Sequence, residues 1–442
     1  MIEILKTYDN NLNCPLHITN DMQLTELRGI AGRTLSSLCT DGEDGNLLVF
    51  PKDLSEYGDD IGNSCIFEIE GNTIYTSNLM GFIGIGDTML KIGSRFDRDG
   101  NDYFMHYMLQ RIFSVNMLDL QYSYNSEDIF DFILFLFPYY LKRALSQGVY
   151  KEYRTFERND SRIRGVLDVN RHIRLNYPAT GAIAYRSREH TLDNNITELI
   201  RHTIEYIKSK EFGDSILRCD EDTKYCVSQI VQATNGYERN QRQYIINRNL
   251  RPRIHPLYFE YDNLRKLCLQ ILRHEEIKYG EDKEKVYGVV FDGAWLWEEY
   301  LNTILSPLDI LHPKNKTKEG GIYLFANRTG RRYPDFMGNN IILDAKYKGY
   351  GCKNLSEIER NDIAQIISYM YVEQAEKGVL ISPGNDSLHC VSNTLRGYGG
   401  TMSLVSIPIS KAMDYESFTA DMSHTEKDLS AMIYQMMASR PQ

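Results

Sequence analysis

The chain has 442 residues, of which 42% are hydrophobic, enough to fill the cores of two or three domains, and this argues against an intrinsically disordered protein. Its formal net charge of -10 excludes a generally basic DNA-binding surface, so any contact with nucleic acid must be local or supplied by a partner. The eight cysteines are scattered without a C-x-x-C pair, which indicates reduced thiols rather than a disulfide framework.

The start of the chain lacks a signal-peptide pattern, and the most apolar run, 132–137, is far shorter than the ~20 residues of a membrane helix. We therefore expect a soluble, cytoplasmic protein that makes no membrane contact.

Residues 1–120 contain short apolar runs separated by Gly, Asn and Asp, which predicts a β-rich N-terminal domain. The predicted strands are 47–50, 64–69, 73–76, 80–86 and 88–92. Glycines at 81, 84 and 86 are arranged like a phosphate-binding loop, but a strand and not a helix follows them, so we favour close backbone packing or bulges. The acidic segment 97–102 lacks EF-hand spacing and is predicted to be a solvated turn.

Residues 121–253 form a mixed, largely helical middle region. A helix is predicted from Ser126 to Gln147, kinked or split at Pro138, and further helices from Asp193 towards Lys210 and near 221–234. A polar, Arg- and Asn-rich break over 235–253 gives the domain boundary. Four arginines suit a phosphate patch, a partner contact or a solvated charged face, and the sequence does not decide among these. They are Arg162, Arg164, Arg171 and Arg174.

Residues 254–442 alternate helices with strands, so we expect an α/β domain there and an α+β chain as a whole. The predicted helices are 258–276, 293–305 and 363–372, and the predicted strands are 322–325, 333–337, 341–347 and 378–382.

Two acidic residues and a lysine lie on consecutive strands of this domain. Asp335 is on one strand, Asp344 and Lys346 are on the next, and Gly338-Asn-Asn forms the turn. Residues two apart on a strand project from the same face, so Asp344 and Lys346 converge, and tight pairing brings Asp335 beside them. Paired carboxylates bind Mg²⁺, and a lysine can orient water and meet negative charge, which predicts phosphodiester hydrolysis. The alternative is the solvated end of a buried strand.

Pro334-Asp335 followed by Asp344-Ala-Lys346 resembles the signature of the PD-(D/E)xK nuclease superfamily. This resemblance implies a nuclease core of that fold and a further carboxylate on the preceding helix, for which Glu298 fits and Glu299 competes. Gln365-Ile-Ile-Ser-Tyr369 resembles the Q-x-x-x-Y element of the RecB-like branch, and a spacing of four places both residues on one helix face. A plain packing face is the alternative.

Longer blocks resemble McrC, the nuclease subunit of modification-dependent McrBC restriction systems. They are Leu296-Trp-Glu-Glu-Tyr300, Arg332-Tyr-Pro-Asp335, Leu343-Asp-Ala-Lys-Tyr-Lys348, Arg164-Gly-Val-Leu-Asp-Val-Asn170 and Asp193-Asn-Asn195. The likeness covers most of the chain and is strongest from 150 to 385. It implies that 254–442 is the nuclease domain, that 1–120 docks on a partner, and that this partner is McrB, a hexameric GTP-hydrolysing AAA+ motor carrying the DNA-reading domain.

We therefore expect a Mg²⁺-dependent endonuclease subunit, with Mn²⁺ as a substitute, that cleaves double-stranded DNA containing modified cytosine and both stimulates and is activated by its GTPase partner. The chain lacks a G-x-x-x-x-G-K-[ST] motif, which agrees with a motor on another chain. The expected metal ligands are Asp335, Asp344, the Ala345 carbonyl and Glu298; Lys346 activates water, and Gln365 and Tyr369 complete the catalytic group. A stand-alone RecB-like nuclease and a non-catalytic regulator of an NTPase remain alternatives.

Overall fold

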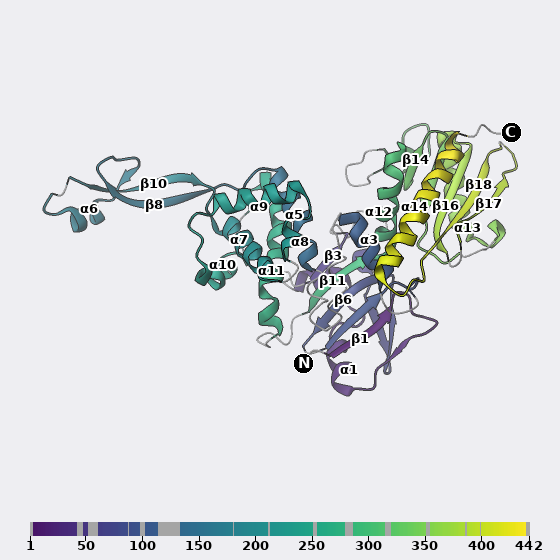
Figure 1. Cartoon of the computed structure of the whole chain (residues 1–442), viewed down its shortest axis with the longest axis horizontal. Coiled ribbons are helices and arrows are strands. Elements are labelled where there is room, and N and C mark those ends of the chain that lie inside the picture. The colour runs from purple at the N-terminus through teal and green to yellow at the C-terminus, as the bar shows by residue number, and fades with distance from the viewer. Residues whose placement is uncertain are drawn as a thin grey trace. The chain divides into compact units, whose positions relative to one another are not determined.

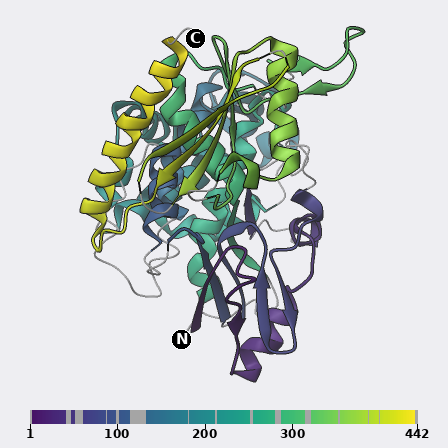
Figure 2. The ribbon, with the colours of Figure 1, turned by 90° about the vertical axis from the view of Figure 1, so that its right-hand side faces the viewer.

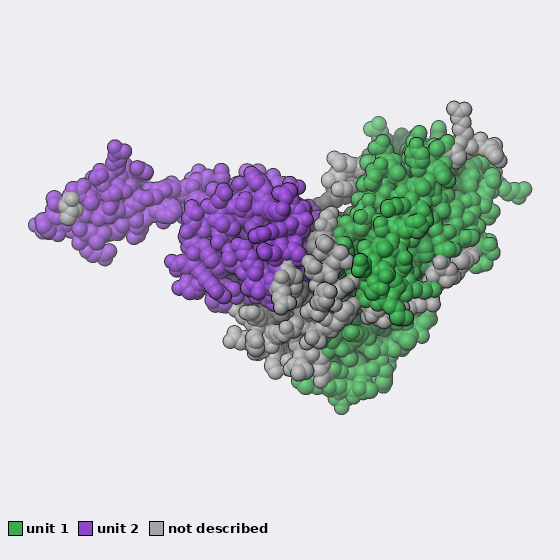
Figure 3. Space-filling model, in the orientation of Figure 1, with its two compact units in different colours: residues 1–129, 277–442 green, residues 130–276 purple. Residues whose placement is uncertain are grey.

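The computed structural model describes most of the chain (Figure 1). The described residues are 3–41, 47–51, 61–86, 88–97, 102–113, 133–179, 181–210, 213–250, 254–278, 286–313, 320–350, 354–384, 387–397 and 399–438. The chain divides into two compact units, unit 1 with residues 1–129 and 277–442, and unit 2 with residues 130–276 (Figure 3). Among the described residues, no helix combines the length and apolar character that crossing a membrane requires.

Unit 1 contains two five-stranded sheets and the helices that cover them. Its strands are β1 (Glu3–Tyr8), β2 (Leu16–His17), β3 (Leu47–Phe50), β4 (Phe67–Glu70), β5 (Thr73–Thr76), β6 (Leu79–Ile85), β7 (Thr88–Gly93), β11 (Tyr287–Asp292), β12 (Ile322–Tyr323), β13 (Arg331–Arg332), β14 (Phe336–Gly338), β15 (Ile341–Ala345), β16 (Lys377–Gly384), β17 (His389–Thr394) and β18 (Thr401–Pro408). Its helices are α1 (Asp21–Arg28), α2 (Leu35–Asp41), α3 (Tyr103–Phe113), α12 (Gly293–Leu305), α13 (Arg360–Glu373) and α14 (Tyr415–Ala438). Short 3₁₀ turns are η1 (Ile61–Asn63), η5 (Ser306–Leu308) and η6 (Leu355–Glu357).

The first five-stranded sheet has the order β1-β7-β6-β11-β3. Its strand β11 comes from the C-terminal part of the sequence, pairs antiparallel with β6 and parallel with β3, and leads directly into α12. Glycines allow this close approach: a Cβ on Gly81 would lie 2.1 Å from the carbonyl oxygen of Val289, and φ of Gly81 is +126°. The prediction of close backbone packing, instead of a phosphate loop, is confirmed at Gly81.

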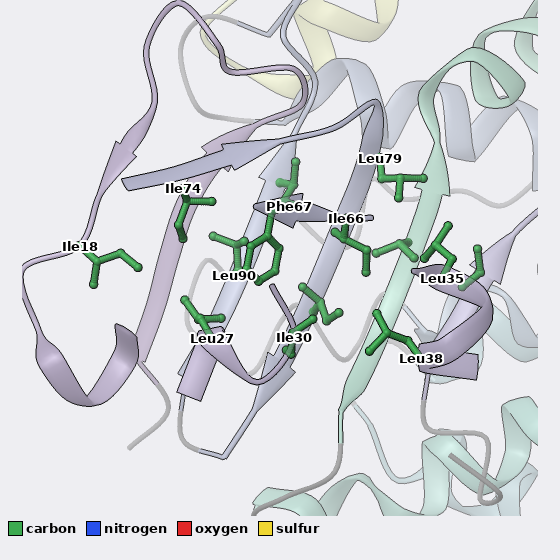
Figure 4. Packing of buried hydrophobic residues seen from close by; sticks show 14 of the residues in the cluster. Ile18, Leu27, Ile30, Leu35, Leu38, Ile66, Phe67, Ile74, Leu79 and Leu90 are labelled. Carbon is green, nitrogen blue, oxygen red and sulfur yellow. The ribbon is translucent and has the colours of Figure 1, made fainter. Parts of the chain in front are cut away.

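The core of this N-terminal part lies between the first sheet and a small sheet of order β2-β5-β4. Helix α1 is capped by Asn20, whose side chain accepts a hydrogen bond from the backbone N–H of Met22. Leu27 of α1 is fully buried against Ile74 and Leu90 of the strands (Figure 4). Burial of such side chains contributes roughly 1.5–3 kcal/mol each, so this cluster stabilises the fold on which β11 and α12 depend.

The second five-stranded sheet has the order β14-β15-β16-β18-β17. Strands β15, β16 and β18 are parallel, and β14 and β17 run antiparallel at the two edges. Helix α13 connects β15 to β16, as a parallel pair requires. Figure 2 shows the sheet between α13 and α14. On the α13 side, Ile342, Leu380 and Leu404 of the strands pack with Ile366 of the helix.

Unit 2 combines a helical body with an extended arm. Its helices are α5 (Phe137–Ser146), α6 (Val169–Asn176), α7 (Asn195–Lys208), α8 (Gly213–Leu217), α9 (Glu221–Ala233), α10 (Arg242–Arg248) and α11 (Glu260–Lys278), with 3₁₀ turns η3 (Arg239–Gln241) and η4 (Pro256–Tyr258). The arm consists of α6 and a sheet of order β8-β10-β9, formed by β8 (Glu152–Asp160), β9 (Val166–Leu167) and β10 (Ile183–Thr191).

The mixed α/β class expected from the sequence is confirmed, as are the predicted strands over 47–50 and 73–76 and the helix over 293–305. The predicted break at 235–253 is wrong in part, because Ile245 and Ile246 bury one face of α10 there. Helix α5 begins at Phe137 with Pro138 in its first turn, where proline needs no N–H partner. Residues 126–132 of the predicted helix, and 98–101 of the predicted turn, lie outside the described residues. The three-domain division stays a prediction.

Candidate active site

Two residues, Asn339 and Asn340, form the turn between β14 and β15. Asn340 has a φ of 60°, a left-handed conformation that asparagine tolerates and that tight hairpins require. The register pairs Phe336 with Leu343, and Asp335 precedes β14 immediately instead of lying inside a strand as predicted. This short hairpin is the local reason why residues nine to eleven apart in sequence meet.

The hairpin brings Asp335, Asp344 and Lys346 together. Asp335 Oδ2 accepts a hydrogen bond of 2.7 Å from the backbone N–H of Ala345. Lys346 Nζ lies 2.6 Å from Asp344 Oδ2, and Asp344 is fully buried while Lys346 is 16% exposed. The predicted convergence of Asp344 and Lys346 is therefore confirmed in its geometry, although β15 ends at Ala345 and Lys346 follows the strand directly instead of lying within it.

Helix α13 supplies the next layer of contacts to the lysine. Lys346 Nζ donates a 3.1 Å hydrogen bond to Gln365 Oε1, and Gln365 Nε2 donates a 3.0 Å hydrogen bond to the Tyr369 hydroxyl. The spacing of four residues places Gln365 and Tyr369 on one helix face, as predicted. The two side chains thus form a chain of hydrogen bonds that ends on the ammonium group.

Helix α12 brings Glu298 to the same group. Asp292 caps this helix by accepting a 2.8 Å hydrogen bond from the backbone N–H of Trp295. Burial, together with the charges of Asp335, Glu299 and Asp344, raises the pKa of Glu298 well above its usual range. Of the two adjacent glutamates, Glu298 is therefore the one that faces the paired aspartates.

The aspartates and the glutamate outnumber the nearby cations, and their pKa values reflect this. Burial and the charge of Asp344 together raise the pKa of Asp335 to about 8, although Lys346 partly opposes them. Burial also raises the pKa of Asp344. Burial lowers the pKa of Lys346, but the carboxylates outweigh it and raise that pKa above its usual value, so Lys346 is charged at neutral pH. One positive charge here faces several acidic groups.

A divalent cation fits this donor set in one respect. Asp344 Oδ1 is buried and accepts no hydrogen bond from any described residue, an expensive condition for a buried carboxylate. Among the described residues, no group of three or more His, Cys, Asp or Glu side chains is arranged to hold a metal ion. Mg²⁺ does not need a group of three such side chains, because it keeps several waters and binds through one or two carboxylates and the phosphates of a substrate. The residues therefore fit Mg²⁺ better than a caged structural ion.

The sequence analysis missed two residues that border the site. His312 Nδ1 lies 2.7 Å from the carbonyl oxygen of Asp335 and 3.7 Å from Glu298 Oε1, and the acidic groups around it raise its pKa despite burial. Asp362 lies 3.8 Å from Lys346 Nζ and 3.0 Å from Lys348 Nζ. The spacing of three between Asp362 and Gln365 on α13 was the one available signal; no local pattern marks His312.

A buried polar network fixes the orientation of α12. Glu426 of α14 accepts hydrogen bonds of 2.9 Å from the Tyr107 hydroxyl and 3.0 Å from the Tyr300 hydroxyl, and its other oxygen lies 3.0 Å from Arg111. Tyr300 is two residues after Glu298 on α12. Helices α3 and α14 therefore hold the helix that carries the auxiliary glutamate.

The four arginines singled out in the middle region lie in unit 2. Arg171 lies 3.6 Å from Glu157, whereas Arg162, Arg164 and Arg174 are exposed. Their predicted roles as a phosphate patch or partner contact, and the alternative of a solvated face, all stay predictions.

Comparisons with known proteins point in one direction. A family model described as McrBC 5-methylcytosine restriction system component matches residues 74–383. A chain of the "Refined half-complex from tetradecameric assembly of Thermococcus gammatolerans McrB AAA+ hexamers with bound McrC" is similar over 96% of this chain and 100% of its own, with a TM-score of 0.50 and 14% identity. At this identity the similarity concerns the fold alone.

A chain of the cryo-EM structure of the Thermococcus gammatolerans McrBC complex aligns over 69% of this chain and 87% of its own, with a TM-score of 0.33 and 16% identity. A comparison with curated proteins found no match.

Proposed function

The chain belongs to the family of McrBC 5-methylcytosine restriction system components, and from this premise we propose that it is the DNA-cleaving subunit of such a system. It hydrolyses phosphodiester bonds of double-stranded DNA that carries modified cytosine, in a PD-(D/E)xK nuclease core with Mg²⁺, or Mn²⁺ as a substitute. The observation that carries the proposal is the 2.6 Å distance between Lys346 Nζ and Asp344 Oδ2. The carboxylate of Asp335 joins this pair, because it accepts a hydrogen bond from the backbone N–H of Ala345.

The acidic residues suit the binding of a divalent cation. Asp335, Asp344 and the carbonyl group of Ala345 would hold Mg²⁺, with Glu298 as an auxiliary carboxylate. When bound, Mg²⁺ lowers the pKa of a water and offsets charge on the phosphate. Crowding of the carboxylates supports this role, because like charges that raise one another's pKa values are relieved by a cation.

Lys346 suits two tasks at the reacting phosphate. Its ammonium group can orient the attacking water and offset the negative charge that develops in the transition state. Gln365 fixes the direction of the ammonium group through its 3.1 Å hydrogen bond, and Tyr369 fixes Gln365 in turn. Such positioning matters, because a catalytic group displaced by about 1 Å can lose a large part of its effect.

We also propose that an AAA+ partner activates the chain. The similar assembly from Thermococcus gammatolerans consists of McrB AAA+ hexamers with bound McrC. Our chain has no G-x-x-x-x-G-K-[ST] motif of its own and has a net charge of -10. A nuclease of this kind needs a motor and a DNA reader from elsewhere, and it stimulates GTP hydrolysis by the partner in return. The N-terminal region 1–120 is the proposed docking part.

The substitution Lys346→Ala tests the assignment. It should reduce cleavage of modified DNA by about 10³-fold or more, because it removes the cation that faces the developing charge. GTP hydrolysis by the AAA+ partner should still be stimulated. Lys427→Ala, at an exposed lysine of α14, is the matched control and should cleave normally.

Undiminished cleavage by the Lys346→Ala variant would refute the site. Vigorous cleavage by the purified chain alone, on linear and nicked DNA, would favour the stand-alone RecB-like nuclease. Stimulated GTP hydrolysis with no Mg²⁺-dependent cleavage by the unaltered chain would favour the non-catalytic regulator.

A further inference from the structure

A short two-stranded ribbon leads directly into the candidate site. Strands β12 and β13 pair antiparallel, with Ile322 opposite Arg332 and Tyr323 opposite Arg331. The loop between them is ordered by backbone hydrogen bonds, including one of 2.9 Å from the N–H of Arg328 to the carbonyl of Phe325. We call residues 321–332 the basic ribbon. In Figure 2 it is the green pair of strands that stands away from the sheet at the upper right.

The base of the basic ribbon is fixed to the nuclease core, whereas its tip is exposed. Ile322 is 4% exposed and packs in the same cluster as Ile342 and Ile366. At the tip, the side chain of Phe325 is 61% exposed. Arg332 precedes Asp335 by three residues, which limits the separation of their Cα atoms to about 11 Å. A molecule that reaches Asp335 therefore lies within range of the ribbon.

The charge of the basic ribbon is opposite to that of the whole chain. It contains Arg328, Arg331 and Arg332, and residues 320–334 include no acidic residue, although the chain carries a net charge of -10. Among the described residues, neither Arg328 nor Arg332 forms an ion pair with a carboxylate. Cations placed without acidic partners, a few residues from a proposed phosphodiester site, suit the phosphates of the substrate.

The aromatic residues of the basic ribbon prepare it for such a contact. The guanidinium of Arg331 lies 5.5 Å from the centre of the Tyr323 ring and 5.2 Å from that of Tyr333. This stacking stiffens the ribbon at its base. Phe325 presents an exposed apolar ring on the same ribbon as exposed Arg328 and Arg332, and the combination of arginines with an exposed ring is typical of surfaces that bind nucleic acid.

We propose that the basic ribbon binds the DNA duplex beside the scissile phosphate, with Arg328 and Arg332 on backbone phosphates and Phe325 against sugar or base edges in a groove. A two-stranded ribbon is narrow enough for the major groove. This inference rests on the proposed function, since it assigns a substrate contact to the same site. It also explains how an acidic chain holds DNA locally. We choose the duplex over a protein as the binding partner because the ribbon adjoins the candidate site and its charged side chains are all positive.

The test is DNA binding by the full-length chain with Ca²⁺ in place of Mg²⁺, using a fluorescein-labelled 30-base-pair duplex and fluorescence anisotropy across a salt series. The logarithm of the binding constant falls with the logarithm of salt concentration, with a slope of about -0.9 per phosphate contact. In the Arg328→Gln/Arg332→Gln variant the slope should lose about 2 in magnitude. Phe325→Ser should weaken binding about fivefold or more and leave the slope unchanged.

The matched control is Arg396→Gln/Lys427→Gln, which removes the same charge at two exposed positions elsewhere in unit 1 and should keep the wild-type slope. Thermal unfolding of each variant verifies that it is folded. An unchanged slope and affinity in the ribbon variants, or no binding by the wild-type chain even at low salt, overturns the inference. Loss of GTPase stimulation with unaltered DNA binding would also overturn it, because the ribbon would then face a protein.

Lys346→Ala separates this inference from the proposed function. That variant should bind the duplex with wild-type slope while failing to cleave. If it cleaves normally, the proposed function fails, whereas the salt slope still reports on the ribbon. If it is inactive and the ribbon variants bind normally, the ribbon inference alone fails.

Discussion

Each of the two five-stranded sheets of unit 1 has a buried aspartate and a basic residue in or next to its strands, with different surroundings. At the ends of β1 and β7 in the first sheet, the backbone N–H of Arg95 donates a 2.6 Å hydrogen bond to fully buried Asp9, and their side chains are 3.4 Å apart. In the second sheet, fully buried Asp344 meets Lys346 at 2.6 Å. Asp344 also interacts electrostatically with two further acidic residues, Asp335 and Glu298.

The difference separates a structural pair from a candidate catalytic one. The charge of Arg95 opposes that of Asp9, and its Nη2 donates to two further acceptors, the side chain of Asn78 at 2.8 Å and the carbonyl of Tyr347 at 2.7 Å. These contacts connect segments that lie far apart in the chain. Around Asp344 the acidic groups exceed the cations. Hydrogen bonding does not distinguish the two sites, because Asp9 and Asp344 each have a buried oxygen without a hydrogen-bond partner among the described residues. A surplus of buried negative charge costs stability and is retained where function requires it.

The largest expected effect on stability is at the structural pair. Arg95→Met should lower the free energy of unfolding by about 3–5 kcal/mol, because it leaves Asp9 buried without its counter-ion. It should also loosen the loop after Lys346, since Arg95 holds the carbonyl of Tyr347. Urea denaturation measures the first effect, and cleavage at saturating DNA measures the second.

Arg28→Met, at an exposed arginine of α1, is the control and should change stability by less than about 0.5 kcal/mol. Arg95→Lys should fall between the two. Wild-type stability in Arg95→Met would remove the basis for calling this pair structural.

The second prediction concerns Asp335 in protein freed of metal by EDTA. Its pKa is about 8 when folded and about 3.9 when unfolded, so between these values the folded state binds more protons. The stability of the wild-type chain should therefore fall as the pH rises from about 4 to about 8. Asp335→Asn, which can still accept the hydrogen bond from Ala345, should be more stable by about 2 kcal/mol at pH 9 and lose this advantage towards pH 4.

Asp428→Asn, at an exposed aspartate of α14, keeps Asp335 and should match the stability of the wild-type chain at pH 4 and at pH 9. Saturating Mg²⁺ should abolish the advantage of Asp335→Asn by stabilising the wild-type chain alone. Two results would contradict the idea that the surplus negative charge serves to bind a cation. One is a stability advantage of Asp335→Asn that persists in Mg²⁺, and the other is an Asp335→Asn variant that is less stable than the wild-type chain at pH 9.

The smallest expected effect is at the edge of the site. Tyr369→Phe removes the hydroxyl that accepts a hydrogen bond from Gln365, and should slow cleavage about two- to tenfold while altering stability by less than about 1 kcal/mol. The measurement is single-turnover cleavage with saturating Mg²⁺. Tyr371→Phe, at a tyrosine that is 67% exposed on the same helix, should cleave at the wild-type rate. Equal rates in all three proteins would reduce Gln365 and Tyr369 to packing residues.

Much of the fold could be predicted because its elements are locally encoded. The Asn194 cap of α7 and the Asn339-Asn340 turn are short-range signals, and each gave the correct element. Strand β11 escaped prediction, because a six-residue apolar run does not reveal that it pairs with β6, two hundred residues earlier. Helix α10 was not predicted, because only two buried isoleucines lie among the Arg and Asn residues of this segment and they give no helical apolar pattern.

The candidate site shows the same division. Spacing alone placed Asp344 with Lys346 and Gln365 with Tyr369, because alternation in a strand and a spacing of four in a helix are periodic. His312, which contacts Asp335, had no such signal. The choice between Glu298 and Glu299 also needed the structure, since adjacent helix residues point about 100° apart and only the neighbours decide which one faces the site.

The sequence by itself determined the hairpin around residues 339–340, the face shared by the aspartate and the lysine, and the family, since each depends on residues close together in the chain. Tertiary structure alone decided that Arg95 lies beside Asp9, and that Asp335 and Glu298 lie with Asp344 and Lys346. Charge balance in a buried space depends on which side chains arrive from distant elements, and the low dielectric there screens the remaining charge only weakly.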